Sequence, residues 1–112
     1  MTNNLAELTI VVYASSQLDI IWDINFVIND KHHREKGPAY LDFHINGGVK
    51  TYHYCKQNKL HREDGPAIIR YNKDESISSK WYYLYNKLHR KEKYFKAISP
   101  QNRIKVLLND SE

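Results

Sequence analysis

Two stretches of the chain are close copies of each other: "NDKHHREKGPAYLDF" (29–43) and "QNKLHREDGPAIIRY" (57–71). His33 of the first stretch matches His61 of the second, which sets an offset of 28 residues. The same step reaches His89 in "YNKLHRKEKYFKAI" (85–98). A fixed spacing of this length indicates one structural unit that is used several times. We therefore predict a repeat fold with a 28-residue period.

Other positions follow the same spacing. They form a lysine column, an arginine column and an aromatic column, made of Lys31, Lys59 and Lys87; Arg34, Arg62 and Arg90; and Phe26, Tyr54 and Tyr82. Gly-Pro-Ala occurs at 37–39 and again at 65–67. The same offset applied backwards places Val12 under Tyr40 and Ile21 under Val49. The N-terminal segment therefore resembles a degenerate half-unit that lacks the Gly-Pro.

The His-Arg-Glu-Asp run at 61–64 has the residue types of an active site. A catalytic group normally occurs once in a domain, whereas a feature of every unit is more simply a need of the scaffold. Gly-Pro forces a sharp bend, since Gly reaches φ > 0 and Pro fixes φ near −65°. We expect Arg62 to pair with Glu63 or Asp64, and His61 to donate to a backbone carbonyl of the turn. The predicted structural turn residues are His33, Arg34, Gly37, Pro38, His61, Arg62, Asp64, Gly65 and Pro66.

Each unit has the pattern of two β-strands. The segments 51–56 and 80–85 are rich in β-forming residues and precede "QNK" and "YNK", in which Asn suits a tight turn. A second strand follows each Gly-Pro and ends at the polar turns 46–48 and 72–76. Alternation places Ala39, Leu41 and Phe43 on one face, with Ala67, Ile69 and Tyr71, and the aromatic column inside. The prediction is a mainly β protein: an antiparallel β-meander of about three stacked hairpin repeats with one C-terminal α-helix.

The chain of 112 residues has the length of a single domain. We divide 1–112 into a degenerate half-repeat with the first strand pair (8–28), repeat 1 (29–56), repeat 2 (57–84), a truncated repeat 3 (85–98) and a C-terminal helix (99–109). In that helix Ser99 is a candidate N-cap and Pro100 suits the first turn. Ile104, Leu107 and Leu108 form one apolar stripe, which we expect to cover the sheet or to bind a second copy or another protein.

Composition excludes several classes of protein. With 41% hydrophobic residues and nine Tyr, the chain lies outside the disordered class. Cys55 is the single cysteine, which excludes a disulfide within the chain and favours a reducing compartment. No segment approaches the ~18 apolar residues of a membrane span, and residues 1–17 lack the basic start of a signal peptide. The expected location is the cytoplasm, with no membrane partner.

The side chains leave two binding hypotheses and little support for catalysis. His32 and His33 are adjacent and would point to opposite faces of a strand, so no metal and no cofactor are predicted. Cys55 and His53 lack an orienting group, so no catalytic residue is predicted and the chain is not expected to be an enzyme. Protein binding is favoured by aromatic and Arg residues, and nucleotide or nucleic-acid binding is the alternative, through the Arg and Lys columns. The predicted partner-binding residues are Trp81, Tyr83 and Tyr85, taken as exposed on one side, with Arg62, Arg90, Lys59 and Lys87.

The residues "NKLHREDGPAII", with "HHREKGPAYLDF" before them and "KWYYLYNKLHR" after them, resemble the His-Arg-Glu-Asp-Gly-Pro-Ala repeat proteins of tailed bacteriophages and large DNA viruses. Those proteins are similar to MORN-like, antitoxin-type β-hairpin repeats. The resemblance covers about residues 22–95 and implies a twisted β-meander that binds partners. It also implies a small viral protein that blocks a host protein. A CRISPR complex, another nuclease or another immune effector is the expected target. Lys36 in place of Asp64, and a third copy that keeps only His89 and Arg90, depart from the family pattern.

Overall fold

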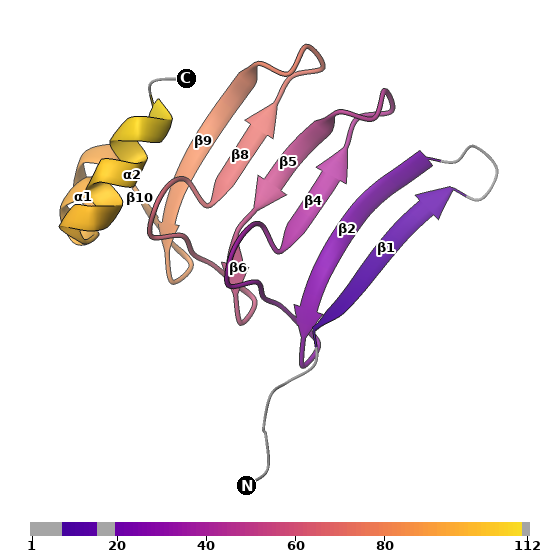
Figure 1. Ribbon diagram of the computed structural model, residues 1–112, viewed down its shortest axis with the longest axis horizontal. Coiled ribbons are helices and arrows are strands. Elements are labelled where there is room, and N and C mark those ends of the chain that lie inside the picture. Colours follow the sequence, from indigo (N-terminus) through magenta and orange to yellow (C-terminus); the bar gives the residue numbers. More distant parts are fainter. Residues whose placement is uncertain (1–7, 16–19, 111–112) are drawn as a thin grey trace, which may run out of the picture.

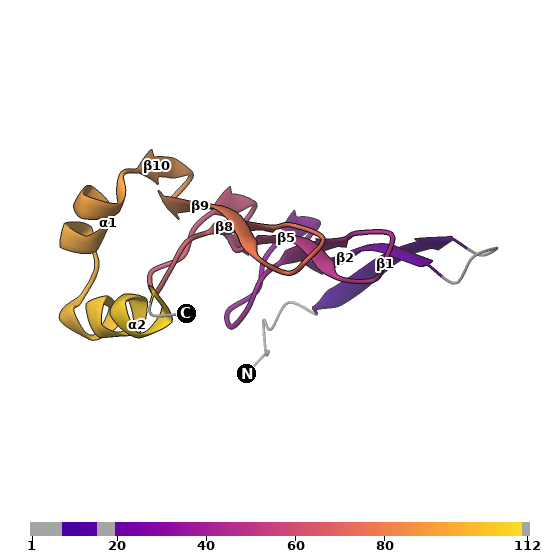
Figure 2. The ribbon, with the colours of Figure 1, turned by 90° about the horizontal axis from the view of Figure 1, so that it is seen from above.

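The computed structural model describes residues 8–15 and 20–110. Within these residues the chain forms a mainly β structure in which an antiparallel sheet is followed by two helices. Figure 1 shows the strands side by side from β1 at one edge to β9, with both helices at the far end. The edge-on view in Figure 2 shows a thin, single-layered sheet, and the molecule measures 50 × 47 × 21 Å. The prediction of a mainly β antiparallel fold with a C-terminal helix is confirmed.

The main sheet has the strand order β1-β2-β4-β5-β8-β9-β10, with β3 paired to β2. Its longer strands are β1 (Thr9–Ser15), β2 (Ile20–Ile28), β5 (Val49–His53) and β9 (Ile77–Leu84). The shorter ones are β3 (Lys31–His32), β4 (Tyr40–Phe43), β8 (Ile68–Tyr71) and β10 (Lys87–His89). A separate two-stranded ribbon is formed by β6 (Cys55–Lys56) and β7 (Lys59–Leu60).

Three tight turns share one backbone geometry. Both central residues have positive φ at 29–30, 57–58 and 85–86, between strands that pair directly on either side. This is the geometry of a two-residue type I′ hairpin turn, which matches the natural twist of the strands. Asp30, Asn58 and Asn86 occupy the second turn position, and Asn and Asp tolerate positive φ better than most residues. The turn chemistry predicted from Asn is therefore present in the structure.

The register separates two faces of the sheet. One cross-strand row contains Val12, Ile24, Leu41, Tyr52, Ile69 and Lys80, and we call its side the helix face. The neighbouring row contains Val11, Asn25, Tyr40, His53, Ile68 and Trp81, and we call its side the open face. Val12 and Leu41 are thus in one row, both opposite Ile24, so the predicted equivalence of Val12 with Tyr40 is wrong by one residue.

The C-terminal region contains two helices where the sequence predicted one. Helix α1 (Lys91–Ala97) lies within the segment assigned to the truncated third repeat, so this segment is not a hairpin throughout. The reason is that "KYF" replaces Gly-Pro-Ala there, so no breaker interrupts helix formation. Ile98 is extended and Pro100 opens α2 (Pro100–Asp110). The Ser99 side chain accepts a hydrogen bond from the Asn102 N–H at 3.2 Å, as its predicted N-cap role requires.

The core is small and lies where the helices meet the sheet. Tyr82, Tyr94, Ile98 and Val106 form one buried cluster, and Val106 is the apolar α2 residue that points into it. The predicted stripe of Ile104, Leu107 and Leu108 does not cover the sheet, because these side chains are 59%, 59% and 67% exposed. Val106 packs against Tyr94 of α1 and against Ile98, which follows that helix, and this contact fixes the rotation of α2.

Candidate functional site

The Gly-Pro corner at 61–66 is built around the side chain of Arg62. Its Cζ lies 4.0 Å from the centre of the Tyr54 ring. Its Nε donates to Asp64 Oδ1 at 2.9 Å, and its Nη1 donates to the Pro66 carbonyl at 3.1 Å. A Cβ on Gly65 would lie 2.8 Å from Arg62 Cζ, so only glycine leaves room for the guanidinium. The predicted pairing of Arg62 with a turn carboxylate is therefore present, with Asp64 as the partner.

The corner at 33–38 repeats most of these contacts. Arg34 Cζ lies 4.0 Å from the centre of the Phe26 ring, and Nη1 donates to the Pro38 carbonyl at 3.3 Å. Gly37 has a φ of 115°, and a Cβ there would lie 3.0 Å from Arg34 Cζ. Lys36 replaces the aspartate of the other corner, which removes the Arg–carboxylate contact. Both corners thus use an arginine stacked on an aromatic ring to hold the bend.

The corner histidines connect each bend to the next hairpin turn. Nδ1 of His33 accepts the Gln57 N–H at 2.9 Å, and Nδ1 of His61 accepts the Tyr85 N–H at 2.9 Å. The prediction that His61 donates to a backbone carbonyl is therefore wrong. An N–H of the positive-φ turn needs an acceptor, and the imidazole supplies one. Nε2 of His61 lies 3.1 Å from Glu63 Oε1, and His61 is 3% exposed, so this side chain is part of the scaffold.

Tyr94 of α1 completes the corner at 61–66, and the sequence did not identify it. Its hydroxyl accepts the Gly65 N–H at 3.1 Å and lies 2.5 Å from the Arg62 carbonyl and 2.8 Å from the Gly65 carbonyl. The ring is fully buried against Tyr82. One signal was available, because Tyr94 stands 28 residues after Pro66, where the third copy abandons the Gly-Pro. The position at which the third copy departs from the repeat pattern is thus the position of Tyr94, which joins α1 to the corner at 61–66.

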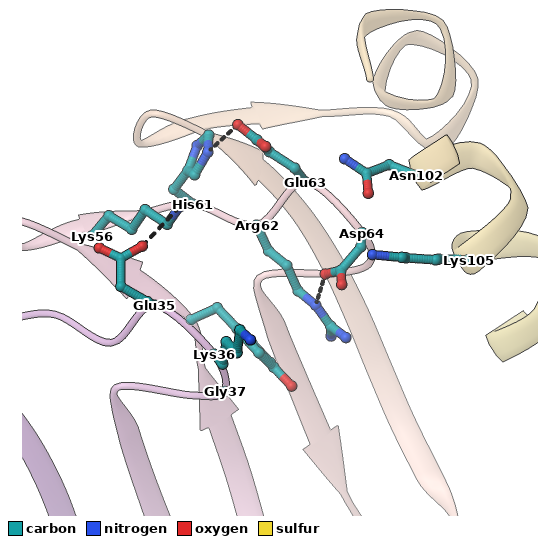
Figure 3. Close-up of a pocket in the computed structure, with 11 residues that line it drawn as sticks. Glu35, Lys36, Gly37, Lys56, His61, Arg62, Glu63, Asp64, Asn102 and Lys105 are labelled. Atoms are coloured by element: carbon teal, nitrogen blue, oxygen red, sulfur yellow. Dashed lines mark hydrogen bonds and ion pairs between the residues drawn. The ribbon is translucent and has the colours of Figure 1, made fainter. Parts of the chain in front are cut away.

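A pocket of about 400 Å³ lies between the two corners and α2. Figure 3 shows Asn102 and Lys105 reaching from α2 toward the loop that carries Glu63 and Asp64. Its charged groups are of both signs: Glu35, Glu63 and Asp64 against Lys36, Lys56, Arg62 and Lys105. Hydrogen bonding from His33, followed by the charge of Lys56, lowers the pKa of Glu35. Because opposite charges are interspersed, the pocket presents no strong field of one sign to a ligand.

The predicted basic residues separate into two groups. Arg62 is 16% exposed at its side chain, and its Nε and Nη1 are bonded within its corner, so little of it is open to a partner. Lys59 is exposed on β7. Lys87 and Arg90 line a concave site of about 500 Å³ together with His89 and Lys93. No acidic side chain lines that site, so it is a cationic hollow.

The charge of the chain is concentrated at this end. Residues 87–105 hold seven of the 17 Lys and Arg residues and one of the 13 Asp and Glu residues, a local charge of +6. The remaining positions hold ten cations and twelve acids, a charge of −2. Six of the seven cations are exposed. The overall +4 therefore describes a polarised molecule with one basic end.

The predicted aromatic surface is not continuous. Trp81 and Tyr83 are half-buried, and the guanidinium of Arg70 lies 5.1 Å from the Trp81 ring centre. Tyr85 lies in the 85–86 turn rather than in β9, is 67% exposed, and has its ring centre 4.1 Å from that of His61. The expectation that all three are exposed on one side is wrong, because the strand ends at Leu84 and the turn redirects Tyr85.

A polar network crosses the open face and was not predicted. Asn25 donates to Asp23 Oδ1 at 2.7 Å, and its own Oδ1 lies 2.8 Å from His32 Nε2. Burial, followed by the charges of Asp42 and Asp23, raises the pKa of Tyr40 to about 12. Burial also lowers the pKa of His53. These residues come from different strands and meet only because of the cross-strand register, which the sequence pattern did not reveal.

The remaining candidates for chemistry are the Cys55 thiol and the side chains that could bind a metal ion. Burial raises the pKa of the Cys55 thiol to about 11, so the thiolate that a nucleophile needs is scarce at neutral pH. Among the residues that the structure describes, no three His, Cys, Asp or Glu side chains gather as metal ligands. In the same part of the chain, no helix is long and apolar enough to cross a membrane.

Comparisons with known proteins add no relative. No protein-family model, no curated protein and no solved structure matches the chain.

Proposed function

We propose that the protein is a non-enzymatic binding module whose C-terminal end engages an acidic surface of another protein. The observation that carries this proposal is the segregation of charge, with +6 on residues 87–105 and −2 on the rest. A one-sided field of this kind steers and orients an oppositely charged partner. The concave site of Lys87, His89, Arg90 and Lys93 is the centre of that surface.

Exposed aliphatic side chains next to the cations favour a protein partner. Leu88 is 59% exposed beside the basic hollow, and α2 presents Ile104, Leu107 and Leu108 to solvent. Aliphatic groups gain from burial against another apolar surface but offer bases no ring to stack on. Tyr85 adds one exposed aromatic residue of the type enriched at interface centres. Apolar anchors among cations suit a protein surface with acidic and apolar residues.

We further propose that the scaffold consists of three stacked hairpin units of 28 residues. Support comes from the Arg–aromatic stack, the Arg–Pro carbonyl bond and the His–turn bond, each found at both corners. The third unit then ends in α1 in place of a corner. In this arrangement the motif residues stabilise the scaffold, and the terminal unit is left to bind.

The resemblance to viral His-Arg-Glu-Asp-Gly-Pro-Ala repeat proteins suggests which partner is involved. We propose a host protein in the cytoplasm, such as a component of CRISPR or of another nuclease or immune complex, that is blocked by occupancy. Such inhibition needs a surface and no catalytic group. Those host complexes are the first candidates for a binding assay.

The test is co-purification from host lysate, in which the tagged wild-type protein and two tagged charge-reversal variants are compared. The test variant is Lys87→Glu/Arg90→Glu, and its matched control is Lys50→Glu/Lys73→Glu, which changes two exposed lysines near the opposite ends of the strands. We expect wild type and control to retain one protein at stoichiometric level, and the test variant to lose it. Recovery of no stoichiometric protein by wild type, or equal retention by both variants, contradicts the proposal.

Nucleic-acid or nucleotide binding is the second candidate, because the hollow at Lys87 and Arg90 is lined by cations without acids. Lys31 and Lys59 are exposed at equivalent turns and extend the positive charge. Binding through phosphates weakens steeply with salt. Fluorescence anisotropy with a labelled single-stranded oligonucleotide, measured from about 50 to 200 mM salt, tests this. No binding at the lowest salt excludes the nucleic-acid alternative.

A further inference from the structure

The edge strand β1 has the features of an interface. Among the strands that the structure describes, β1 pairs only with β2, so one side of its backbone is unpaired. Residues 8–15, "LTIVVYAS", contain no charge, proline or glycine. Ile10, Val12 and Tyr13 are 55%, 48% and 59% exposed. Soluble proteins usually protect a free edge with charges, proline or bulges. The register between β1 and β2 shifts between Tyr13 and Ala14, but no charge or proline blocks this apolar edge, so it calls for a cover.

The hydrogen-bond pattern shows which backbone groups are free. The Phe26 N–H donates to the Ala39 carbonyl and the Phe26 carbonyl accepts the His33 N–H, so both groups point away from β1. Phe26 is opposite Ile10, and in a non-hydrogen-bonded antiparallel pair both residues turn their backbone groups outward. Ile10 and, two residues on, Val12 therefore present N–H and C=O to the free edge. Their side chains lie on the helix face.

We propose that β1 pairs antiparallel with β1 of a second copy, centred on Val12. Val12 is the midpoint of Thr9–Ser15, so this register matches the whole strand with itself and places Ile10 opposite Ala14 of the other copy. Val12 then forms a hydrogen-bonded pair with its own equivalent, which its outward backbone groups require. The arrangement is an isologous two-fold interface that joins two sheets into one.

A second copy suits this edge better than another partner. The strand carries no charge that would select a charged partner, and self-pairing brings no like charges together. The pairing buries Val12 against Val12 of the other copy and Ile10 against Ala14 of the other copy, and it satisfies the free backbone groups of both strands. The interface lies at the opposite end of the sheet from residues 87–105 (Figure 1). If β1 does not dimerise, the proposal for the partner site at residues 87–105 is therefore unaffected.

Sedimentation equilibrium of the full chain at tens of micromolar tests the proposal. One strand pair is a small interface, so we expect a dissociation constant on the order of micromolar. Wild type should sediment at twice 13.3 kDa, and Val12→Lys, which places charge on the edge, at 13.3 kDa. The control Leu107→Lys, on exposed α2, should remain dimeric. A monomeric wild type, or a dimer lost in Leu107→Lys and kept in Val12→Lys, overturns the proposal.

Disulfide trapping tests the register without disturbing the charge. In the proposed pair the two Val12 Cα atoms lie about 5.5 Å apart, within the range that a disulfide spans. The two Ile10 residues are separated by four positions, roughly 14 Å along the strand. Oxidised Val12→Cys should give a covalent dimer on a denaturing gel, and Ile10→Cys should not. Equal cross-linking of both variants, or of neither, contradicts the Val12-centred pairing.

Discussion

Replacing Tyr94 by Phe removes one oxygen atom from the most buried contact between α1 and the sheet. In the wild type the hydroxyl accepts the Gly65 N–H and donates to one of two carbonyls, at Arg62 or Gly65. Burial raises the pKa of Tyr94 to about 12, so the hydroxyl keeps its proton at all ordinary pH values. The variant leaves the ring in place and deprives a buried N–H and a buried C=O of their partner.

The magnitude follows from these two groups. A buried polar group without a partner costs about 1 to 3 kcal/mol, so the loss of two partners should lower the free energy of unfolding by about 2 to 6 kcal/mol. A urea slope of about 1 to 2 kcal/mol/M for a domain of this size converts that loss into a midpoint lower by at least about 1 M. Urea unfolding followed by tryptophan fluorescence measures it, with an unchanged slope as the sign that only stability has changed.

Tyr85→Phe is the matched control, since it removes the same atom from a side chain that is 67% exposed. Its free energy of unfolding should stay within about 0.5 kcal/mol of the wild-type value. Equal midpoints for Tyr94→Phe and the control would refute the reasoning, because they would show that the hydroxyl does not hold the corner.

Three further predictions concern Gly37 in the other corner, the Cys55 thiol and the His53 imidazole. Gly37→Ala should cost about 1 to 2 kcal/mol more than Gly47→Ala in urea unfolding, because both have positive φ but only Gly37 meets Arg34; equal losses would contradict the clamp. Cys55, with its pKa raised to about 11 by burial, should react with a disulfide reagent at pH 8 about 200-fold more slowly than in unfolded chains; comparable rates would show an accessible thiol. Burial lowers the pKa of His53, so unfolded chains protonate first and stability should fall as the pH drops from about 6.5 toward the folded pKa; a His53→Gln variant with the same pH slope would exclude this cause.

Much of the fold could be predicted because its signals are local. Gly-Pro dipeptides, Asn turns and alternating apolar residues act within a few positions, and they located the strands and the two corners. The pairing of Arg62 with Asp64 was also local, at a separation of two residues. The helix at Lys91–Ala97 was missed because the third copy was assigned by homology to the other two, although its corner residues are absent.

The site could be predicted only in part because it depends on contacts between distant segments. Arg62 was assigned to a binding surface, but its position over Tyr54 is set by strand packing. The exposure of Ile104 depends on how α2 rotates against Tyr94, which no periodicity reveals. The network at Asn25 and His32 arises from cross-strand register. The basic character of 87–105, by contrast, is a property of composition and was visible in the sequence.

The central claim is that the motif arginines are clamped inside the corners and are not available to a partner. Ring currents test it directly, because protons above an aromatic ring shift upfield in a proton NMR spectrum. The side-chain protons of Arg34 and Arg62, whose guanidinium carbons lie 4.0 Å from the centres of the Phe26 and Tyr54 rings, should be shifted upfield. Those of exposed Arg90 should stay near random-coil values. Random-coil shifts for Arg34 and Arg62 as well would contradict the account.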